Sequence, residues 1–292
     1  MKGASKKMNQ CIEQYGIAVF TLVLVAILIF FSSPLGMKIK NATTNKVSQT
    51  EEIGKDGVTV ATGGVVRPDE PTEAVDQVWC YIGKDGELVI SQTQITAPNG
   101  SITLSKKIDC IQLGIKIANS FANSTLVIKT VRFEGAVKVK TCEQMFYACT
   151  NLKEIKNIEN LYTNECTNMR QMFRDCNNLE TLDIRSFDTS KVENMAQMFL
   201  NCNKLTAVDV SKWNTMNCTT MFAMFSSCNS LQSLDLSRWN LSKMTEPLSK
   251  DYLFTNCSSF STKSIKVSQS IYDELISEPH LGITTDKFDI IN

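Results

Sequence analysis

Cysteine is the residue type with the most chemical potential in this sequence. Eleven cysteines occur among 292 residues, beside a single histidine, His280. Thiolates act as nucleophiles and metal ligands, but zinc sites and Cys-His catalysis also need positioned imidazoles or closely spaced cysteine pairs. The chain has one imidazole, next to Pro279, and no Cys-x-x-Cys pair. We therefore expect a protein that is not an enzyme, without catalytic residues, cofactor or metal, in which His280 is a surface-loop residue.

The spacing of the cysteines points to a structural role instead. Met172-Phe173 is followed by Cys176, and the Met-Phe-x-x-Cys pattern returns at steps of 26 residues. An earlier copy lies 27 residues upstream and a degraded copy lies downstream. The cysteines at this position are Cys149, Cys176, Cys202, Cys228 and Cys257. A constant period of this length is typical of repeat proteins.

Three more cysteines share apolar positions of the repeat. Cys166 and Cys218 align with Val192, and Cys142 aligns with Met169. Cysteine at such positions behaves as a small hydrophobic residue, so we expect most thiols in the core. Two alternatives stay open. One is a disulfide between adjacent repeats, since a spacing of ~4.8 Å suits a bridge. The other is a pair formed by Cys80 and Cys110.

Each repeat also contains a strand pattern and a turn pattern. The triplet Leu179, Leu182 and Ile184 has L-x-x-L-x-L spacing, which puts apolar side chains on one face of a short strand. The segment that contains Val192 and Met195 has helical spacing. We predict one strand and one helical turn per repeat, with neighbouring repeats stacked so that both bury their apolar faces.

The repeat resembles a known family. The stretch "MFRDCNNLETLDIRSFDTSKVENMAQMF" closely resembles the BspA-like leucine-rich repeats of bacterial surface proteins. The resemblance covers Lys140 to about Cys257, and the first repeat departs from it because "IKNIENLYTNECTNM" lacks the LDLS and FDTS elements. The resemblance implies a non-enzymatic surface protein of a family associated with adhesion and host or matrix contact.

The N-terminal region has a different character. No charge occurs between Glu13 and Lys38, and 24 uncharged residues would span about 36 Å as a helix, enough for a hydrocarbon core of ~30 Å. We expect residues 14–37 to be a single transmembrane helix, with the repeats on the extracellular side of the cell membrane. The alternative is a cleaved signal that leaves a secreted protein.

These patterns predict the fold and its divisions. We expect an α/β repeat solenoid of the leucine-rich-repeat type, with rungs of about 26 residues, an N-terminal β-rich cap and a preceding transmembrane helix. The expected segments are a basic N-terminus (1–13), the transmembrane helix (14–37), a flexible linker (38–76), the β-rich cap (77–139), the repeats (140–257) and a strand-helix-strand cap (258–292).

The residues between the leucines form the candidate binding site. They alternate with the buried positions of each strand, so they should face outward on the concave side, where solenoids usually bind. These candidate ligand-binding residues are Thr181, Asp183, Arg185, Ala207, Asp209, Ser211, Ser233, Asp235 and Ser237. Phe187, Trp213 and Trp239 share a position after the strand; we interpret them as core filling, the alternative being an exposed strip for carbohydrate.

Two functions fit these observations. The first is a membrane-anchored surface protein whose repeats bind an extracellular protein or glycan without catalysis. The second is a structural component of the cell envelope, whose repeats contact sister subunits or envelope proteins. Lysine and arginine together number 30, as do aspartate and glutamate. This balance gives no reason to expect a nucleic-acid partner.

Overall fold

A computed structural model describes residues 67–99, 101, 106–111, 113 and 128–291. The chain divides into two units, Met1–Val66 and Arg67–Asn292, and all described residues belong to the second. The expected basic N-terminus, the expected transmembrane segment 14–37 and most of the expected linker therefore lie outside the described residues.

The second unit begins with a five-stranded sheet in the order β3-β1-β2-β4-β6. β1 (Gln77–Ile82) and β2 (Glu87–Ser91) form an antiparallel hairpin, and β3 (Lys106–Asp109) pairs antiparallel with β1. The hairpin closes over Gly-Lys-Asp-Gly, within the region predicted to be a β-rich cap, and Gly86 there has a φ of 85°, which favours glycine. β4 (Thr130–Phe133) and β6 (Glu154–Lys156) then add in parallel.

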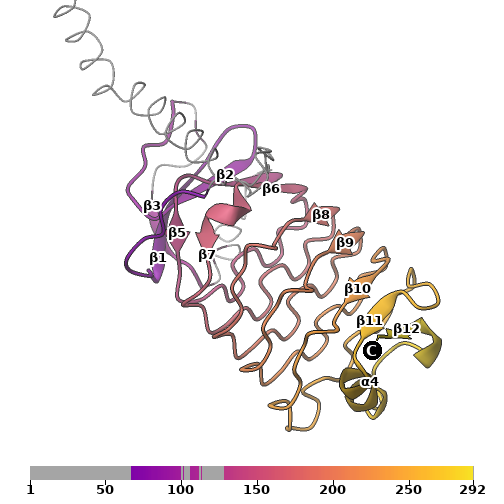
Figure 1. The fold of residues 1–292 in the computed structure, drawn as a ribbon. Coiled ribbons are helices and arrows are strands. Elements are labelled where there is room, and N and C mark those ends of the chain that lie inside the picture. The colour runs from indigo at the N-terminus through magenta and orange to yellow at the C-terminus, as the bar shows by residue number, and fades with distance from the viewer. Residues whose placement is uncertain (1–66, 100, 102–105, 112, 114–127, 292) are drawn as a thin grey trace, which may run out of the picture. The chain divides into compact units, whose positions relative to one another are not determined.

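From β4 onward the chain forms stacked rungs, each about one repeat long (Figure 1). β5 (Val137–Lys138) pairs in parallel with β7 (Leu161–Tyr162), which follows the short 3-10 helix η1 (Ile158–Asn160). β8 (Thr181–Leu182) pairs in parallel with β9 (Ala207–Val208). β10 (Leu234–Asp235), β11 (Ile265–Val267) and β12 (Phe288–Ile290) form a parallel sheet at the C-terminal end, completed by α4 (Gln269–Ile276) and η2 (Thr285–Lys287).

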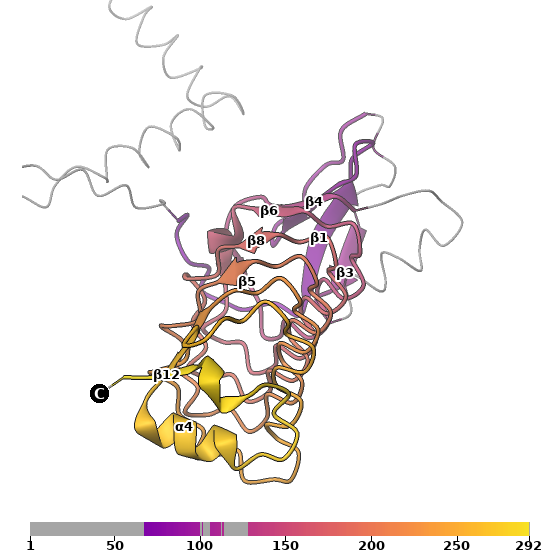
Figure 2. The same cartoon turned by 90° about the vertical axis from the view of Figure 1, so that its right-hand side faces the viewer.

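The Met-Phe-x-x-Cys segments form a wall of tight turns, seen as closely spaced coils in Figure 2. In this wall successive backbone N–H groups alternate between two kinds of partner. Met172 and Arg174 donate within the rung, to the carbonyls three residues back. Gln171 and Asp175 have left-handed backbone, with φ values of 58° and 63°. The N–H groups on either side of Met172 and Arg174 donate to the next rung. These bonds run from Gln171, Phe173 and Asp175 to the carbonyls of Ala196, Met198 and Leu200, at 3.0, 2.9 and 2.8 Å. The wall is therefore held by bonds between rungs, not by a helix.

The left-handed positions give a prediction. Ala223 has a φ of 52° and is 5% exposed, whereas Ala196 is also buried but lies outside the left-handed region. Alanine in the left-handed region is strained by roughly 1 kcal/mol or more, and glycine has no such strain because it lacks a Cβ atom. We expect Ala223→Gly to leave stability within about 0.5 kcal/mol, because relieved strain offsets the entropy that glycine adds to the unfolded chain.

Ala196→Gly is the matched control for that substitution. It relieves no strain, so we expect it to lower the free energy of unfolding by about 1 kcal/mol. Urea unfolding of both variants measures the difference. Equal losses in the two variants would contradict the assigned backbone conformation.

The core lies between the strands and the wall of turns. The predicted core positions Met169, Met172, Phe173 and Cys176 are all fully buried, which confirms that part of the sequence interpretation. The cysteines do more than fill space. Cys176, Cys202, Cys228 and Cys257 each donate a thiol hydrogen bond to a phenylalanine carbonyl of the preceding rung, at 3.0–3.2 Å. Burial raises the pKa of Cys149 and Cys257 to about 12, so these thiols stay protonated at neutral pH.

The predicted fold class, an α/β solenoid of the leucine-rich-repeat type with a transmembrane helix, is wrong. The described residues form mainly small sheets and turns, with the short α-helix α4 near the C-terminus. The segment with helical apolar spacing is not helical because its N–H groups alternate between bonds within a rung and bonds to the next rung. The apolar period gave the correct buried side of this segment but the wrong backbone conformation.

The predicted membrane localisation is corrected as well. Across residues 67–99, 101, 106–111, 113 and 128–291, no helix has the length and apolar character needed to cross a bilayer. Single-pass anchoring, with the repeats on the extracellular side, therefore has no support from any described helix.

Candidate binding surface

The candidate residues lie in a row along three successive short strands. β8 and β9 pair in parallel register, with Thr181 opposite Ala207 and Leu182 opposite Val208. Continuing that register by one residue places Asp183 beside Asp209. Leu182 and Val208 are each 7% exposed, whereas the residues beside them are exposed. The predicted residues thus lie on one face, which we call the strand face; six are exposed, and Ser211, Asp235 and Ser237 are half-buried. Its residues are Thr181, Asp183, Arg185, Ala207, Asp209, Ser211, Ser233, Asp235 and Ser237.

Each aspartate of the strand face closes a local turn. Asp183 accepts hydrogen bonds from the Arg185 backbone and guanidinium, with Nη2 2.6 Å from Oδ2. In the next two rungs Asp209 and Asp235 each accept from the backbone N–H and hydroxyl of the serine two residues later. The hydrogen bond from Arg185 lowers the pKa of Asp183, and the Ser211 hydroxyl lowers the pKa of Asp209. Asp183 and Asp209 are thereby held as carboxylates.

Cations flank this acidic row, a feature that sequence reasoning missed. At the C-terminal end Asp235 lies opposite Lys266 of β11, which lies opposite Asp289 of β12. At the N-terminal end Arg132 lies opposite Lys156 of β6. Arg132 and Lys156 both pair with Glu87, at 3.2 and 3.4 Å. The two exposed aspartates, Asp183 and Asp209, and the half-buried Asp235 therefore lie between Lys156 and Lys266, with Asp289 beyond Lys266, a pattern visible in sequence only once the register is known.

The aromatic residues that follow the strands are buried. Phe187, Trp213 and Trp239 are 6%, 2% and 5% exposed, which confirms the prediction of core filling. Trp239 donates from Nε1 to the Val210 carbonyl at 3.1 Å. These rings are therefore not a surface strip on which a sugar could stack.

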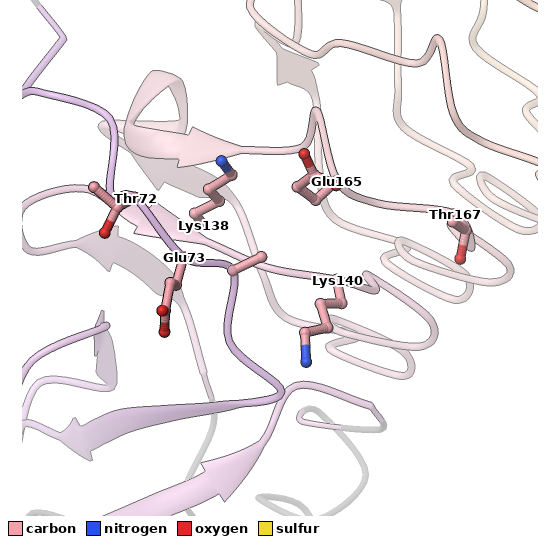
Figure 3. Close-up of a pocket in the computed structure, with 7 residues that line it drawn as sticks. Thr72, Glu73, Lys138, Lys140, Glu165 and Thr167 are labelled. Carbon is pink, nitrogen blue, oxygen red and sulfur yellow. The ribbon is translucent and has the colours of Figure 1, made fainter.

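A pocket of about 580 Å³ lies near the first rungs (Figure 3). Lys138 and Lys140 occupy its centre, between Thr72 and Glu73 on one side and Glu165 and Thr167 on the other. Ala74 completes the lining. Most of these charges are already paired: Lys138 with Glu70 at 2.7 Å, Lys140 with Asp76 at 2.9 Å, and Glu165 with Lys191 at 2.7 Å. The sequence gave no sign of this pocket because residues 72–74 reach it from a segment expected to be linker.

The one histidine, His280, lies on the surface near the C-terminal end, as the sequence predicted. His280 Nδ1 lies 3.0 Å from Oδ2 of Asp251, a carboxylate that is 1% exposed, and the ring stacks on Tyr252 at 5.3 Å. The Tyr252 N–H donates to the His280 carbonyl at 2.8 Å. Beyond this pair, no described group of histidine, cysteine, aspartate or glutamate has an arrangement that could hold a metal ion.

With this geometry in place, comparison with known proteins locates the repeats. Residues 140–267 match the model of a protein family described as "Mycoplasma protein of unknown function, DUF285". The matched region spans the stacked rungs and ends with β11. This part of the chain is therefore similar to a family of Mycoplasma proteins. No curated protein and no solved structure matches the chain.

Proposed function

We propose that the repeats bind another protein, without catalysis, through the strand face, and that they are of the BspA-like type. The observation that carries the proposal is the row of Asp183, Asp209 and Asp235, which lie directly after β8, directly after β9 and in β10; the first two are exposed and the third is half-buried. Side chains such as Ala207 and Ser233 are short and leave room for a partner, whose basic groups would replace Arg185 on Asp183 and the serine hydroxyls on Asp209 and Asp235. Parallel rungs set the three carboxylates at steps of ~4.8 Å, a spacing that suits basic side chains of an extended partner segment.

A protein partner fits this face better than a glycan. Lectin-type sites usually stack sugars on exposed aromatic rings, and the aromatic residues next to the strand face are buried. Carboxylates pair best with arginine and lysine through charge-assisted hydrogen bonds. Lys156 and Lys266, on either side of the three aspartates, would repel a basic partner segment bound out of place and so supply register as well as attraction.

A second candidate function is assembly with sister subunits. It is favoured by exposed apolar residues near the end of the stack: Ile276, Ile290 and Ile291 are 43%, 40% and 37% exposed. Ile290 belongs to β12, which pairs with β11 alone in its sheet. Edge strands with exposed apolar residues pair readily with another chain.

The two functions separate in one experiment. The full chain is immobilised to recover protein partners, beside a triple variant, Asp183→Asn, Asp209→Asn and Asp235→Asn. We expect the triple variant to lose at least tenfold in partner affinity while its mass in solution by light scattering stays unchanged. Each carboxylate would contribute roughly 0.5–1 kcal/mol as an exposed ion pair.

A charge-matched control removes three exposed carboxylates outside the strand face. It carries Asp188→Asn, Glu193→Gln and Glu246→Gln. We expect this control to bind as the unaltered chain does. Equal binding by both triple variants would rule out the strand face, and self-association of the unaltered chain that both variants retain would favour assembly through the apolar C-terminal end.

A further inference from the structure

The wall of turns ends with residues 278–282, which we call the closing coil. Two backbone bonds attach it to the coil before it. They run from the Tyr252 N–H to the His280 carbonyl at 2.8 Å and from the Phe254 N–H to the Leu281 carbonyl at 3.0 Å. The Leu281 side chain enters the core and is 6% exposed. The closing coil therefore covers the C-terminal edge of the wall.

A buried carboxylate lies against the closing coil. Asp251 is 1% exposed, and its Oδ2 lies 3.0 Å from Nδ1 of His280. Its other oxygen, Oδ1, is also buried and accepts no hydrogen bond from any residue that the structure describes. A buried carboxylate is costly unless hydrogen bonds or a positive charge compensate it. His280 is placed to supply that charge when its imidazole is protonated.

The neighbouring charges increase the need for a cation. Lys250 is 9% exposed, and its Nζ lies 3.1 Å from Glu278 of the closing coil and 3.9 Å from Glu274 of α4. With a neutral imidazole, this group has the carboxylates of Asp251, Glu274 and Glu278 against one ammonium group. A proton on His280 adds a second cation next to the carboxylate that is most deeply buried.

The imidazole itself is open to solvent. The His280 side chain is 52% exposed, whereas that of Asp251 is 2% exposed. The titratable ring of Tyr252 stacks on the imidazole, with ring centroids 5.3 Å apart. Histidine ordinarily changes charge between pH 5 and 8. His280 is the one histidine of the chain, so an effect of pH in this range can be assigned to a single imidazole.

We propose that protonation of His280 fastens the closing coil to the wall, so that pH sets how often this edge is uncovered. In the closed state the imidazolium faces the Asp251 carboxylate, and in the open state water surrounds it instead. The proton is therefore held more tightly in the closed state than in the open one. By linkage, closure is favoured at pH values where the imidazole is protonated, and this advantage is lost as rising pH removes the proton.

Amide hydrogen exchange in the full chain at pH 6 and pH 8 tests the proposal. The exchange rates are corrected for their pH dependence in an unfolded chain, and mass spectrometry reads the peptide that contains Phe254. The amide of Phe254 reports opening because its acceptor is the Leu281 carbonyl of the closing coil. We expect this opening to be about fivefold or more frequent at pH 8 than at pH 6.

The matched control within the same chain is the amide of Phe199. It occupies the equivalent position in the middle of the wall and donates to the Met224 carbonyl at 2.9 Å. We expect its opening to change by less than about twofold between the two pH values, because no histidine lies in that part of the wall. An equal change at Phe254 and Phe199 would overturn the proposal, and this comparison requires no variant.

Two variants separate the charge of the imidazole from the fit of the coil. His280→Gln can still donate a hydrogen bond to Asp251 but takes up no proton, so opening should be equally frequent at both pH values. Gly282→Ala is the reference for an open coil, because a Cβ atom there would lie 2.5 Å from the Thr255 backbone. It should exchange rapidly at both pH values. A pH dependence that persists in His280→Gln, or an unaltered chain whose opening is the same at pH 6 and pH 8, would overturn the proposal.

Discussion

Replacing Phe199 with alanine should lower the free energy of unfolding by about 4 kcal/mol, the range found for fully buried aromatic residues. Phe199 is fully buried in the middle of a stack of five phenylalanines, one from each rung. Its ring centroid lies 5.6 Å from that of Phe173 and 5.4 Å from that of Phe225, with interplanar angles of 6° and 5°. The substitution removes both contacts, each worth roughly 0.5–1.5 kcal/mol beyond area burial.

The effect should be large because no side chain can move into the space. The rungs above and below are tied to this one by backbone hydrogen bonds on both sides, including 2.9 Å bonds from Phe173 to Met198 and from Phe199 to Met224. Interiors held in this way relax little, so most of the vacated volume stays as a cavity. Urea unfolding monitored by far-ultraviolet circular dichroism measures the loss.

Phe222 provides the matched control. It lies in the same Met-Phe region of the next repeat but is only partly buried, with one edge-on contact to Tyr252 at 5.6 Å. We expect Phe222→Ala to cost about 1 kcal/mol, since only part of its apolar surface is removed from water. A loss at Phe199 no greater than at Phe222 would contradict the assigned core.

The buried side of each repeat was predictable from the sequence, whereas the backbone of the turns was not. A fixed period of Met, Phe, Cys and Leu is sufficient to identify positions that face a shared core. Left-handed backbone is usually signalled by glycine, but Gln171, Asp175, Gln197 and Asn201 occupy it here. Their conformation is imposed by bonds to neighbouring rungs, information that lies 25 residues away rather than in the local sequence.

The candidate surface shows the same division. Alternation around Leu182 and Val208 was enough to place Asp183 and Asp209 on an exposed face. The sequence did not predict that Lys156 and Lys266 flank the aspartates, because their rungs lack the complete motif. Only the strand pairing shows that they belong to the row. The pocket was not predicted from the sequence for a related reason. Residues 72–74 line it together with rung residues more than sixty positions later, and no periodic pattern links the two.

One buried threonine in each repeat links its rung to the next by hydrogen bonds. Thr189, in "FDTS", is 1% exposed. Its hydroxyl donates to the Asn214 carbonyl at 3.1 Å and accepts from the Asn214 N–H at 2.9 Å. Thr163 and Thr215 repeat both bonds to Asp188 and Asn240, so that one buried hydroxyl satisfies both backbone groups of one residue in the next rung.

We therefore expect Thr189→Val to lower the free energy of unfolding by about 2–4 kcal/mol, although valine has nearly the same shape. The substitution leaves a backbone donor and a backbone acceptor of Asn214 without their partner, at about 1–3 kcal/mol for each buried group. Thr189→Ser keeps the hydroxyl and loses one methyl group, so it should cost only about 1 kcal/mol. Urea unfolding of the two variants measures both values.

Thr181→Val is the control for the intrinsic effect of exchanging threonine for valine. Thr181 is exposed on β8, where valine is as well tolerated as threonine, so its stability should change by less than about 0.5 kcal/mol. If Thr189→Val matched this control, water would have to replace the hydroxyl between the rungs. If serine failed to restore stability, the methyl group rather than the paired hydrogen bonds would hold the rungs together. A large loss with valine and a small one with serine would show that each rung fixes the next through a single buried hydroxyl.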